Sequence, residues 1–159
     1  MEEAVNAAEK ARVNSKLFIF GGGNSLKVLG GNETVKSVLD GLKRIKQKND
    51  EISTVVLGIC PRLRENNTYD KVRSETNRRI KDEIDRLNAA GQKVKYAEAD
   101  YDLRWDEVFW HDGVHLNEEG TYRLSSLILK SVRKQGGSVD RTSTLVNSAP
   151  RSGGLANNQ

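Results

Sequence analysis

Residues 17–24 read LFIFGGGN, and this stretch decides the fold of the 159-residue chain. Four apolar residues run without a polar interruption and then stop at three glycines. A short apolar run of this kind is typical of a strand that is buried on both faces of a parallel sheet. The glycine turn and Asn24 would then leave the carboxyl end of the strand, which is the edge where parallel sheets bind ligands.

Helical and strand patterns alternate around this strand. Strand patterns recur at residues 54–59, which are rich in β-branched side chains, and at residues 94–99. Apolar residues at helical spacing, together with good helix formers, predict helices over residues 2–13, 32–48 and 69–87 and from Asn117 or Glu118 onward. We expect Asn32 to cap the second helix, Gly91 to end the third, and the last helix to bury one apolar face that includes Tyr122, Leu124 and Ile128.

The alternation of strands and helices predicts an α/β fold. A parallel sheet with right-handed crossovers would be covered by helices, in one domain over residues 1–134. Residues 135–159 are mostly Gly, Ser, Asn, Arg and Thr, with hardly any apolar side chain. Such a segment buries too little surface to offset its ordering entropy, so we expect a disordered polar tail.

The charge of the chain is mildly basic, with 26 Lys and Arg against 22 Asp and Glu. A net charge of +4 over the whole chain does not by itself indicate nucleic acid. Basic residues nevertheless cluster on two helical patterns, which leaves open either a surface that faces a polyanion or ordinary solvated helix faces. The clusters are Lys43, Arg44, Lys46 and Lys48, and Arg73, Arg78, Arg79 and Lys81.

Cys60 is the only cysteine, so it excludes an internal disulfide and a cysteine-based metal cage. It follows an apolar strand pattern and is expected to be a small core residue. No stretch approaches the roughly 18 apolar residues that span a bilayer, and the first residues lack a signal-peptide apolar block. These features predict a cytoplasmic, reducing setting and no membrane span.

Asp112 and His115 are the strongest candidates for catalytic residues. They lie in the run WHDGVHLN, residues 110–117, between the third strand and the last helix. A carboxylate that holds one imidazole nitrogen leaves the other nitrogen to accept a proton, as a general base for an oxygen nucleophile requires. For His111, which has no identified helper, we expect a capped or core-facing imidazole.

Gly22 and Asn24 are candidates for an oxyanion and substrate-binding site. Glycine lets the backbone approach a substrate closely, and the Asn24 amide can donate a hydrogen bond to a developing oxyanion. The alternative is a βα turn in which Asn24 bonds its own backbone. No metal or other cofactor is indicated, since the two histidines lack ligand spacing and the glycine turn lacks a phosphate-loop lysine.

The block DGVHLNEEG, residues 112–120, resembles the Asp-x-x-His block of the SGNH hydrolases, also called GDSL-type esterases and lipases. Gly22-Gly23-Asn24 resembles the Gly-x-Asn portion of an earlier block in that family. Intervening segments that lie in the expected order extend the resemblance over residues 1–134; they are Val55 to Gly58, Pro61-Arg62 and Asn77 to Arg79. The resemblance implies a three-layer α/β/α, flavodoxin-like fold, with Asp112 orienting His115 as general base and Asn24 as oxyanion donor.

The chain departs from that family in two blocks. No counterpart of the Gly-Asp-Ser-like block with the nucleophilic serine, or of the block with an oxyanion glycine, precedes Gly22, so we expect an N-terminally incomplete domain. Ser25 lies beside the oxyanion donor and is expected to point away from the missing nucleophile. Loss of the serine-bearing strand would expose an edge next to residues 17–20, which invites self-association or a partner chain.

Three functions follow from these features. The first is a hydrolase related to serine esterases that cleave small acyl-ester substrates, impaired in this chain by the missing serine block. The second is an inactive binding or scaffold domain, of a kind that accompanies some retroelement proteins. The third is a nucleic-acid module that uses Arg62, Arg64 and the basic helices, with salt-dependent affinity. The third has no aromatic stacking series or recognition motif to support it.

Overall fold

The computed structural model describes residues 1–12, 14–99 and 106–133. The predicted polar tail, residues 135–159, lies outside the described residues, as does residue 13. In chain order the elements are α1 (Glu2–Lys10), β1 (Lys16–Ile19), α2 (Gly23–Lys48), β2 (Ser53–Leu57), α3 (Asn67–Ala89), β3 (Val94–Ala97), the 3-10 helix η1 (Asp106–Val108) and α5 (Glu118–Arg133).

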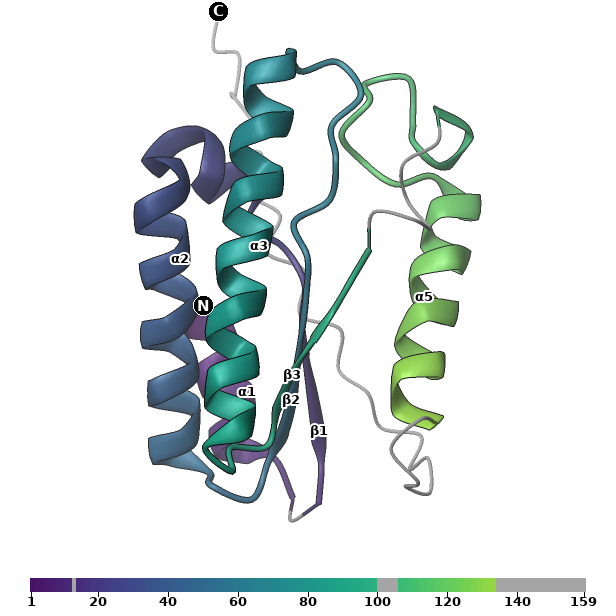
Figure 1. Cartoon of the computed structure of the whole chain (residues 1–159). Coiled ribbons are helices and arrows are strands. Elements are labelled where there is room, and N and C mark those ends of the chain that lie inside the picture. Colours follow the sequence, from purple (N-terminus) through teal and green to yellow (C-terminus); the bar gives the residue numbers. More distant parts are fainter. Residues whose placement is uncertain (13, 100–105, 134–159) are drawn as a thin grey trace, which may run out of the picture.

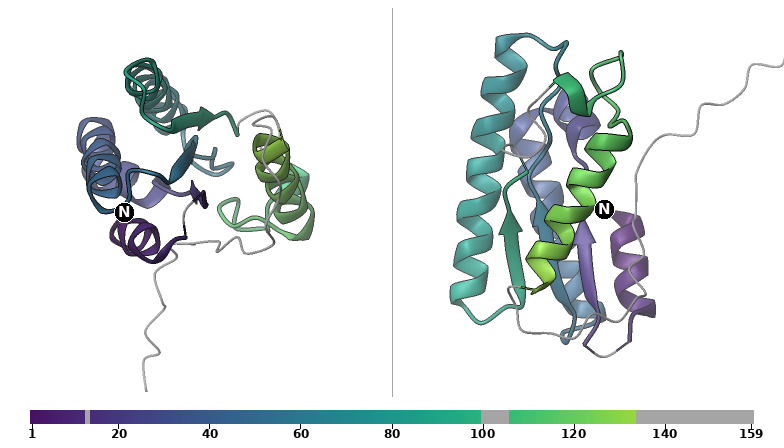
Figure 2. Two further views of the ribbon diagram at one scale, coloured as in Figure 1. Left: turned by 90° about the horizontal axis from the view of Figure 1, so that it is seen from below. Right: turned by 90° about the vertical axis from the view of Figure 1, so that its right-hand side faces the viewer.

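The sheet has three parallel strands in the order β1-β2-β3. Phe18 of β1 is in register with Val55 of β2, and Val56 of β2 is in register with Tyr96 of β3. Helices α2 and α3 lie on one side of this sheet and α5 lies on the other (Figure 1). The view along the strands in Figure 2 shows the same arrangement. The predicted α/β/α architecture with a parallel sheet is therefore confirmed.

The central strand β2 is buried on both faces because each face meets a different helix layer. Val56 packs toward α2 and α3, whereas Val55 and Leu57 pack toward α5. On the α2 and α3 side, the buried cluster comprises Leu26, Val35, Leu42, Val56, Ile59, Ile80, Ile84 and Val94. On the α5 side it comprises Phe18, Val55, Leu57, Ala99, Leu124 and Ile128. This alternation explains why the strand reads as a continuous apolar run.

Helix α1 packs against α2 and β1 through a third buried cluster. Val5 and Ala8 of α1 meet Leu17 of β1 and Ile45 of α2 in this cluster. The helix ends at Lys10, earlier than the predicted residue 13, and Ala11 is extended. Figure 2 shows α1 beside β1, at the end of the helix layer that also holds α2 and α3.

The predicted cap at Asn32 is wrong, because helical structure begins at Gly23. The early start is stabilised by Leu26, which is buried in the core and whose N–H bonds the Gly22 carbonyl. Gly30 interrupts the helix with φ 78°, a conformation that glycine adopts without steric cost. Asn32 lies beyond this break and accepts a hydrogen bond from Arg79 Nη1.

The last helix begins where it was predicted, at Glu118. Leu124 and Ile128 are buried against the sheet, as the apolar spacing indicated. Tyr122 does not belong to the buried face, since 69% of its surface is exposed. Among the described residues, no helix has both the length and the apolar character needed to cross a membrane.

Candidate active site

The Asp112–His115 segment forms a tight turn that the side chain of Asp112 stabilises. Oδ1 of Asp112 accepts hydrogen bonds from the backbone N–H groups of Val114, at 2.8 Å, and His115, at 3.0 Å. Gly113 takes φ 68° within this turn, which favours glycine. The Trp110 N–H donates to the His115 carbonyl at 2.8 Å and closes the loop. The sequence Asp-Gly-x-His therefore builds its geometry locally, as Asx turns do.

The same turn brings the two candidate catalytic side chains together. Oδ2 of Asp112 lies 2.6 Å from Nδ1 of His115. Since a carboxylate only accepts, Nδ1 carries the proton in this pair, and in the neutral imidazole Nε2 is left with a lone pair. The imidazole hydrogen bond, followed by the two backbone N–H groups, holds the pKa of Asp112 well below its ordinary range. The dyad is open to solvent, with 69% of the His115 side chain exposed.

Asn117 fixes the dyad turn to the start of α5. Its Oδ1 caps the helix by accepting from the Gly120 N–H at 3.0 Å. Its Nδ2 donates to the carbonyls of Glu107, at 2.7 Å, and Phe109, at 3.1 Å. A Cβ on Gly120 would lie 2.1 Å from the Val108 carbonyl oxygen, so glycine is needed for this close approach. These contacts join the dyad turn directly to the first turn of α5.

Gly22 follows β1 and directly precedes α2, and Asn24 is the second residue of that helix. Gly22 is the residue before the helix and takes φ 93°. Asn24 is exposed, and its Oδ1 accepts a hydrogen bond of 2.5 Å from Arg62 Nη2. The alternative in which the Asn24 side chain bonds its own backbone is not observed among the hydrogen bonds of the described residues. Both candidate residues therefore occupy the predicted carboxyl edge of the sheet.

The loop that follows β2 links these residues to the dyad. Arg62 contacts Asn24, and the N–H of the next residue, Leu63, donates to the Gly113 carbonyl at 3.0 Å. Within the described part of the chain, no hydrogen bond joins Gly22 or Asn24 directly to Asp112 or His115. The two halves of the candidate site are connected through this loop.

Two polar residues of α3 fix the start of the loop that follows β2, by hydrogen bonds to the backbone of Ile59. Asn77 is buried, and its side-chain amide bonds both backbone groups of Ile59. It accepts from the Ile59 N–H at 2.8 Å and donates to the Ile59 carbonyl at 3.0 Å. Arg73, also buried, donates from Nη1 to the same carbonyl at 3.0 Å and pairs with Asp70. Helical spacing from Ile80 places both residues on the buried face, a signal that could have identified them from sequence.

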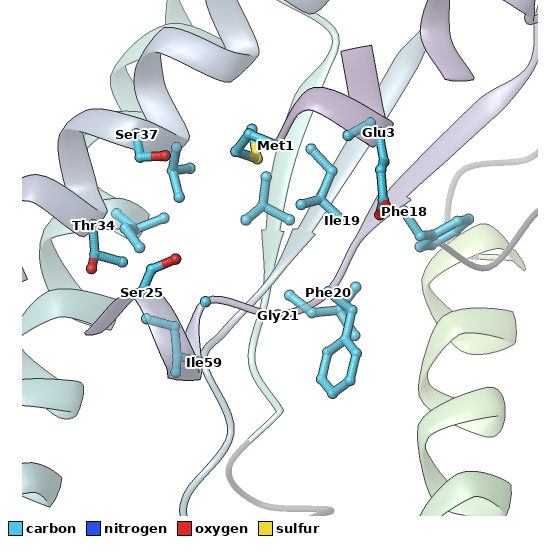
Figure 3. Close-up of a pocket in the computed structure, with 16 residues that line it drawn as sticks. Met1, Glu3, Phe18, Ile19, Phe20, Gly21, Ser25, Thr34, Ser37 and Ile59 are labelled. Carbon is cyan, nitrogen blue, oxygen red and sulfur yellow. The ribbon is translucent and has the colours of Figure 1, made fainter. Parts of the chain in front are cut away.

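Ser25 faces a cavity that Gly22 also lines but the dyad does not. The cavity has a volume of about 110 Å³, and its other lining residues include Met1, Ile19 of β1 and Ser37 of α2. Figure 3 shows the Ser25 hydroxyl on the cavity side of α2. Neither Asp112 nor His115 lines this cavity. In the described residues, no hydrogen bond connects a serine hydroxyl to His115.

Most basic residues of the two predicted clusters have acidic partners or are buried. Arg73 is buried against Ile59, and Arg79 bonds Asn32. Ion pairs join Arg44 to Glu2, Lys46 to Asp50, Lys48 to Glu9, Arg78 to Glu75 and Asp82, and Lys81 to Asp85. Mixed charges of this kind are typical of a solvated helix face and weaken the case for a polyanion-binding surface.

Solved structures that resemble this one include a carbohydrate esterase and a GDSL-like lipase. A family 3 carbohydrate esterase from Clostridium thermocellum has a TM-score of 0.60 at 20% identity, over 77% of this chain and 59% of that protein. A protein described as a GDSL-like lipase from Bacteroides ovatus has a TM-score of 0.54 at 18% identity, over 64% and 32%. No family model and no curated protein matches the sequence. The likeness is one of fold, and the chain shares its α/β/α architecture with these two proteins.

Proposed function

We propose that this chain carries the general base and an oxyanion donor of an SGNH-type ester hydrolase that cleaves small acyl esters. The hydrogen bond between Asp112 and His115 is the observation that carries the proposal. Support also comes from the position of Gly22 and Asn24 at the same edge of the sheet, and from the fold shared with an esterase.

The roles follow from the proton positions in the dyad. Asp112 keeps Nδ1 of His115 protonated, so that Nε2 removes the proton from an attacking hydroxyl. The proton then passes from Nε2 to the alkoxide that leaves the ester. Asn24 Nδ2 donates to the carbonyl oxygen as it gains negative charge, and Gly22 provides the positive-φ turn that leads from β1 into α2.

The nucleophile of this reaction is a serine that the described residues do not bring to His115. Cleavage by the 159-residue chain alone is therefore expected to be impaired relative to a site that includes that serine. The competing function is a scaffold or binding domain that has the dyad geometry without using it. The two functions differ in whether His115 promotes ester cleavage more than a histidine without a carboxylate partner does.

His111 supplies a matched control for that difference. It is exposed, lies four residues before His115, and has no carboxylate partner among the described residues. Cleavage of p-nitrophenyl acetate is measured for the unmodified chain, His115→Ala and His111→Ala. As a general base contributes about 10²–10⁴-fold, we expect His115→Ala to lose most of the activity and His111→Ala to lose little. Equal losses would reject the hydrolase function and favour the scaffold.

A second measurement identifies the nucleophile. A fluorophosphonate probe forms a covalent bond to an activated serine, with fluoride leaving, and mass spectrometry of the peptides locates the label. Labelling of a serine that requires His115 supports the proposed reaction. Labelling of Ser25 would contradict the assignment of Ser25 to a separate cavity.

A further inference from the structure

Arg62 is a charged residue that is largely enclosed at the candidate site. Only 11% of its side chain is exposed, although it carries a charge and belongs to a loop. The guanidinium carbon lies 5.7 Å from the centre of the Tyr69 ring, within the range of a cation–π contact. Nη1 lies 3.7 Å from Glu65 Oε1, and Lys27 contacts the same carboxylate. These contacts hold the guanidinium in one place.

The contact with Asn24 determines which way the Asn24 amide faces. Nη2 of Arg62 lies 2.5 Å from Oδ1 of Asn24. Because a guanidinium has donors and no acceptor, the amide must turn its oxygen toward Arg62. The Nδ2 group then points away from Arg62, and its protons have no acceptor among the described residues. The amide is therefore oriented with its donor available to an outside oxygen.

The absence of a side chain at Gly23 leaves space for the Arg62 guanidinium beside Asn24. A Cβ at Gly23 would lie 3.1 Å from Arg62 Nη2 and 3.3 Å from Nε, both tighter than ordinary contacts. The guanidinium therefore lies directly over the first residue of α2, beside the turn that carries Gly22. A side chain at residue 23 would displace Arg62 without changing its chemistry.

We propose that Arg62 is a positioning residue for the oxyanion site: it fixes the Asn24 amide so that Nδ2 faces the substrate carbonyl oxygen. This proposal rests on the ester-hydrolase function proposed above. The planar fork of arginine suits the role, since it donates to the amide while a second nitrogen faces Glu65. The next residue, Leu63, bonds Gly113, so the same loop sets the amide in relation to the dyad.

The test reads the Asn24 amide directly by NMR in the full chain. The Nδ2 resonances are assigned by their loss in Asn24→Asp. A hydrogen bond from a charged donor to Oδ1 polarises the amide, so Arg62→Met is expected to shift the Nδ2 nitrogen and proton resonances. Gly23→Ala should cause a similar shift, because it displaces an intact Arg62. Unmoved Asn24 resonances in both variants would overturn the proposal.

Arg79 gives a matched control, because it makes the same type of bond elsewhere in the fold. Its Nη1 donates to Asn32 Oδ1 at 2.6 Å. Arg79→Met should shift the Asn32 amide resonances and leave those of Asn24 in place, whereas Arg62→Met should do the reverse. If Arg62→Met shifts both amides, its effect is a general loss of structure and the positioning role is rejected.

Ester hydrolysis provides the second readout. Arg62→Met is expected to lower kcat about tenfold with KM unchanged, a smaller loss than removal of an oxyanion donor causes. The double variant Arg62→Met/Asn24→Ala should be no slower than Asn24→Ala alone, since both changes act on one amide. If the amide shifts but His115→Ala and His111→Ala lose ester cleavage equally, the proposed function fails and the positioning of Asn24 by Arg62 stands.

Discussion

The backbone N–H of Leu63 donates a 3.0 Å hydrogen bond to the carbonyl of Gly113. This bond joins the loop after β2 to the turn that carries Asp112 and His115. The preceding residue, Arg62, bonds Asn24 at the start of α2. One short loop therefore connects segments that are far apart in the sequence, and its position is set by the buried contacts of Ile59 with Asn77 and Arg73.

Replacement of Asp112 by Asn should reverse the tautomer of His115. An amide can present its N–H₂ to Nδ1, which would move the imidazole proton to Nε2 and remove the base from the site. We expect ester cleavage to fall by at least about 100-fold, as loss of the orienting carboxylate does in serine hydrolases. Imidazole nitrogen NMR reports the tautomer of His115 even without activity. An unchanged Nδ1–H form would contradict this role of Asp112.

The Asp112 carboxylate should also make the stability of the fold sensitive to acid. Its pKa is lowered in the folded chain, first by the His115 hydrogen bond. A lowered folded-state pKa stabilises the fold above the unfolded value, and the contribution is lost as the pH falls toward the folded value. The difference in free energy of unfolding between the unmodified chain and Asp112→Asn should therefore shrink below about pH 4. Urea unfolding across this range tests it, and a constant difference would contradict the expectation.

Asn77→Ala should destabilise the chain strongly. The substitution leaves the Ile59 N–H without its partner in the core and removes a donor from the Ile59 carbonyl. An unsatisfied buried backbone group costs about 1–3 kcal/mol, so we expect the free energy of unfolding to fall by that amount in urea titrations.

The neighbouring Arg78→Ala is the control for Asn77→Ala. Arg78 is exposed, and its ion-pair partners among the described residues are Glu75 and Asp82 on its own helix. Surface ion pairs contribute about 0–1 kcal/mol, so its effect should be the smaller of the two. A loss from Arg78→Ala as large as that from Asn77→Ala would show that the contact with Ile59 is not what stabilises the loop.

Comparison of Gly22→Ala with Gly91→Ala distinguishes the loss of stability caused by backbone strain from the loss caused by a steric clash. Both glycines have positive φ, 93° and 86°, but a Cβ at Gly22 would lie 3.2 Å from Ile59 Cγ1, whereas a Cβ at Gly91 meets nothing within 4 Å. A non-glycine residue in such a conformation costs about 1–3 kcal/mol. Gly22→Ala should lose more stability than Gly91→Ala in thermal unfolding, and equal losses would mean that Ile59 moves aside.

Much of the architecture could be predicted because its signals are local. The apolar runs of β1 and β2, and the spacing of Leu124 and Ile128, follow directly from which faces are buried. The early start of α2 was missed, since helix formation from Gly23 depends on burial of Leu26 against distant residues. Tyr122 was wrongly placed inside for a related reason, because spacing does not show where an apolar face ends.

The sequence by itself determined the alternation of strands and helices. It also determined the Asp112–His115 pair, because a turn of four residues carries its own hydrogen bonds. Only the tertiary structure decided the orientation of Asn24 and the roles of Arg62, Arg73 and Asn77. Those contacts join residues 14–38 positions apart, and they form only after packing of the sheet and helices has offset the entropy of bringing the segments together. No local pattern records such a pairing, so the folded chain alone specifies it.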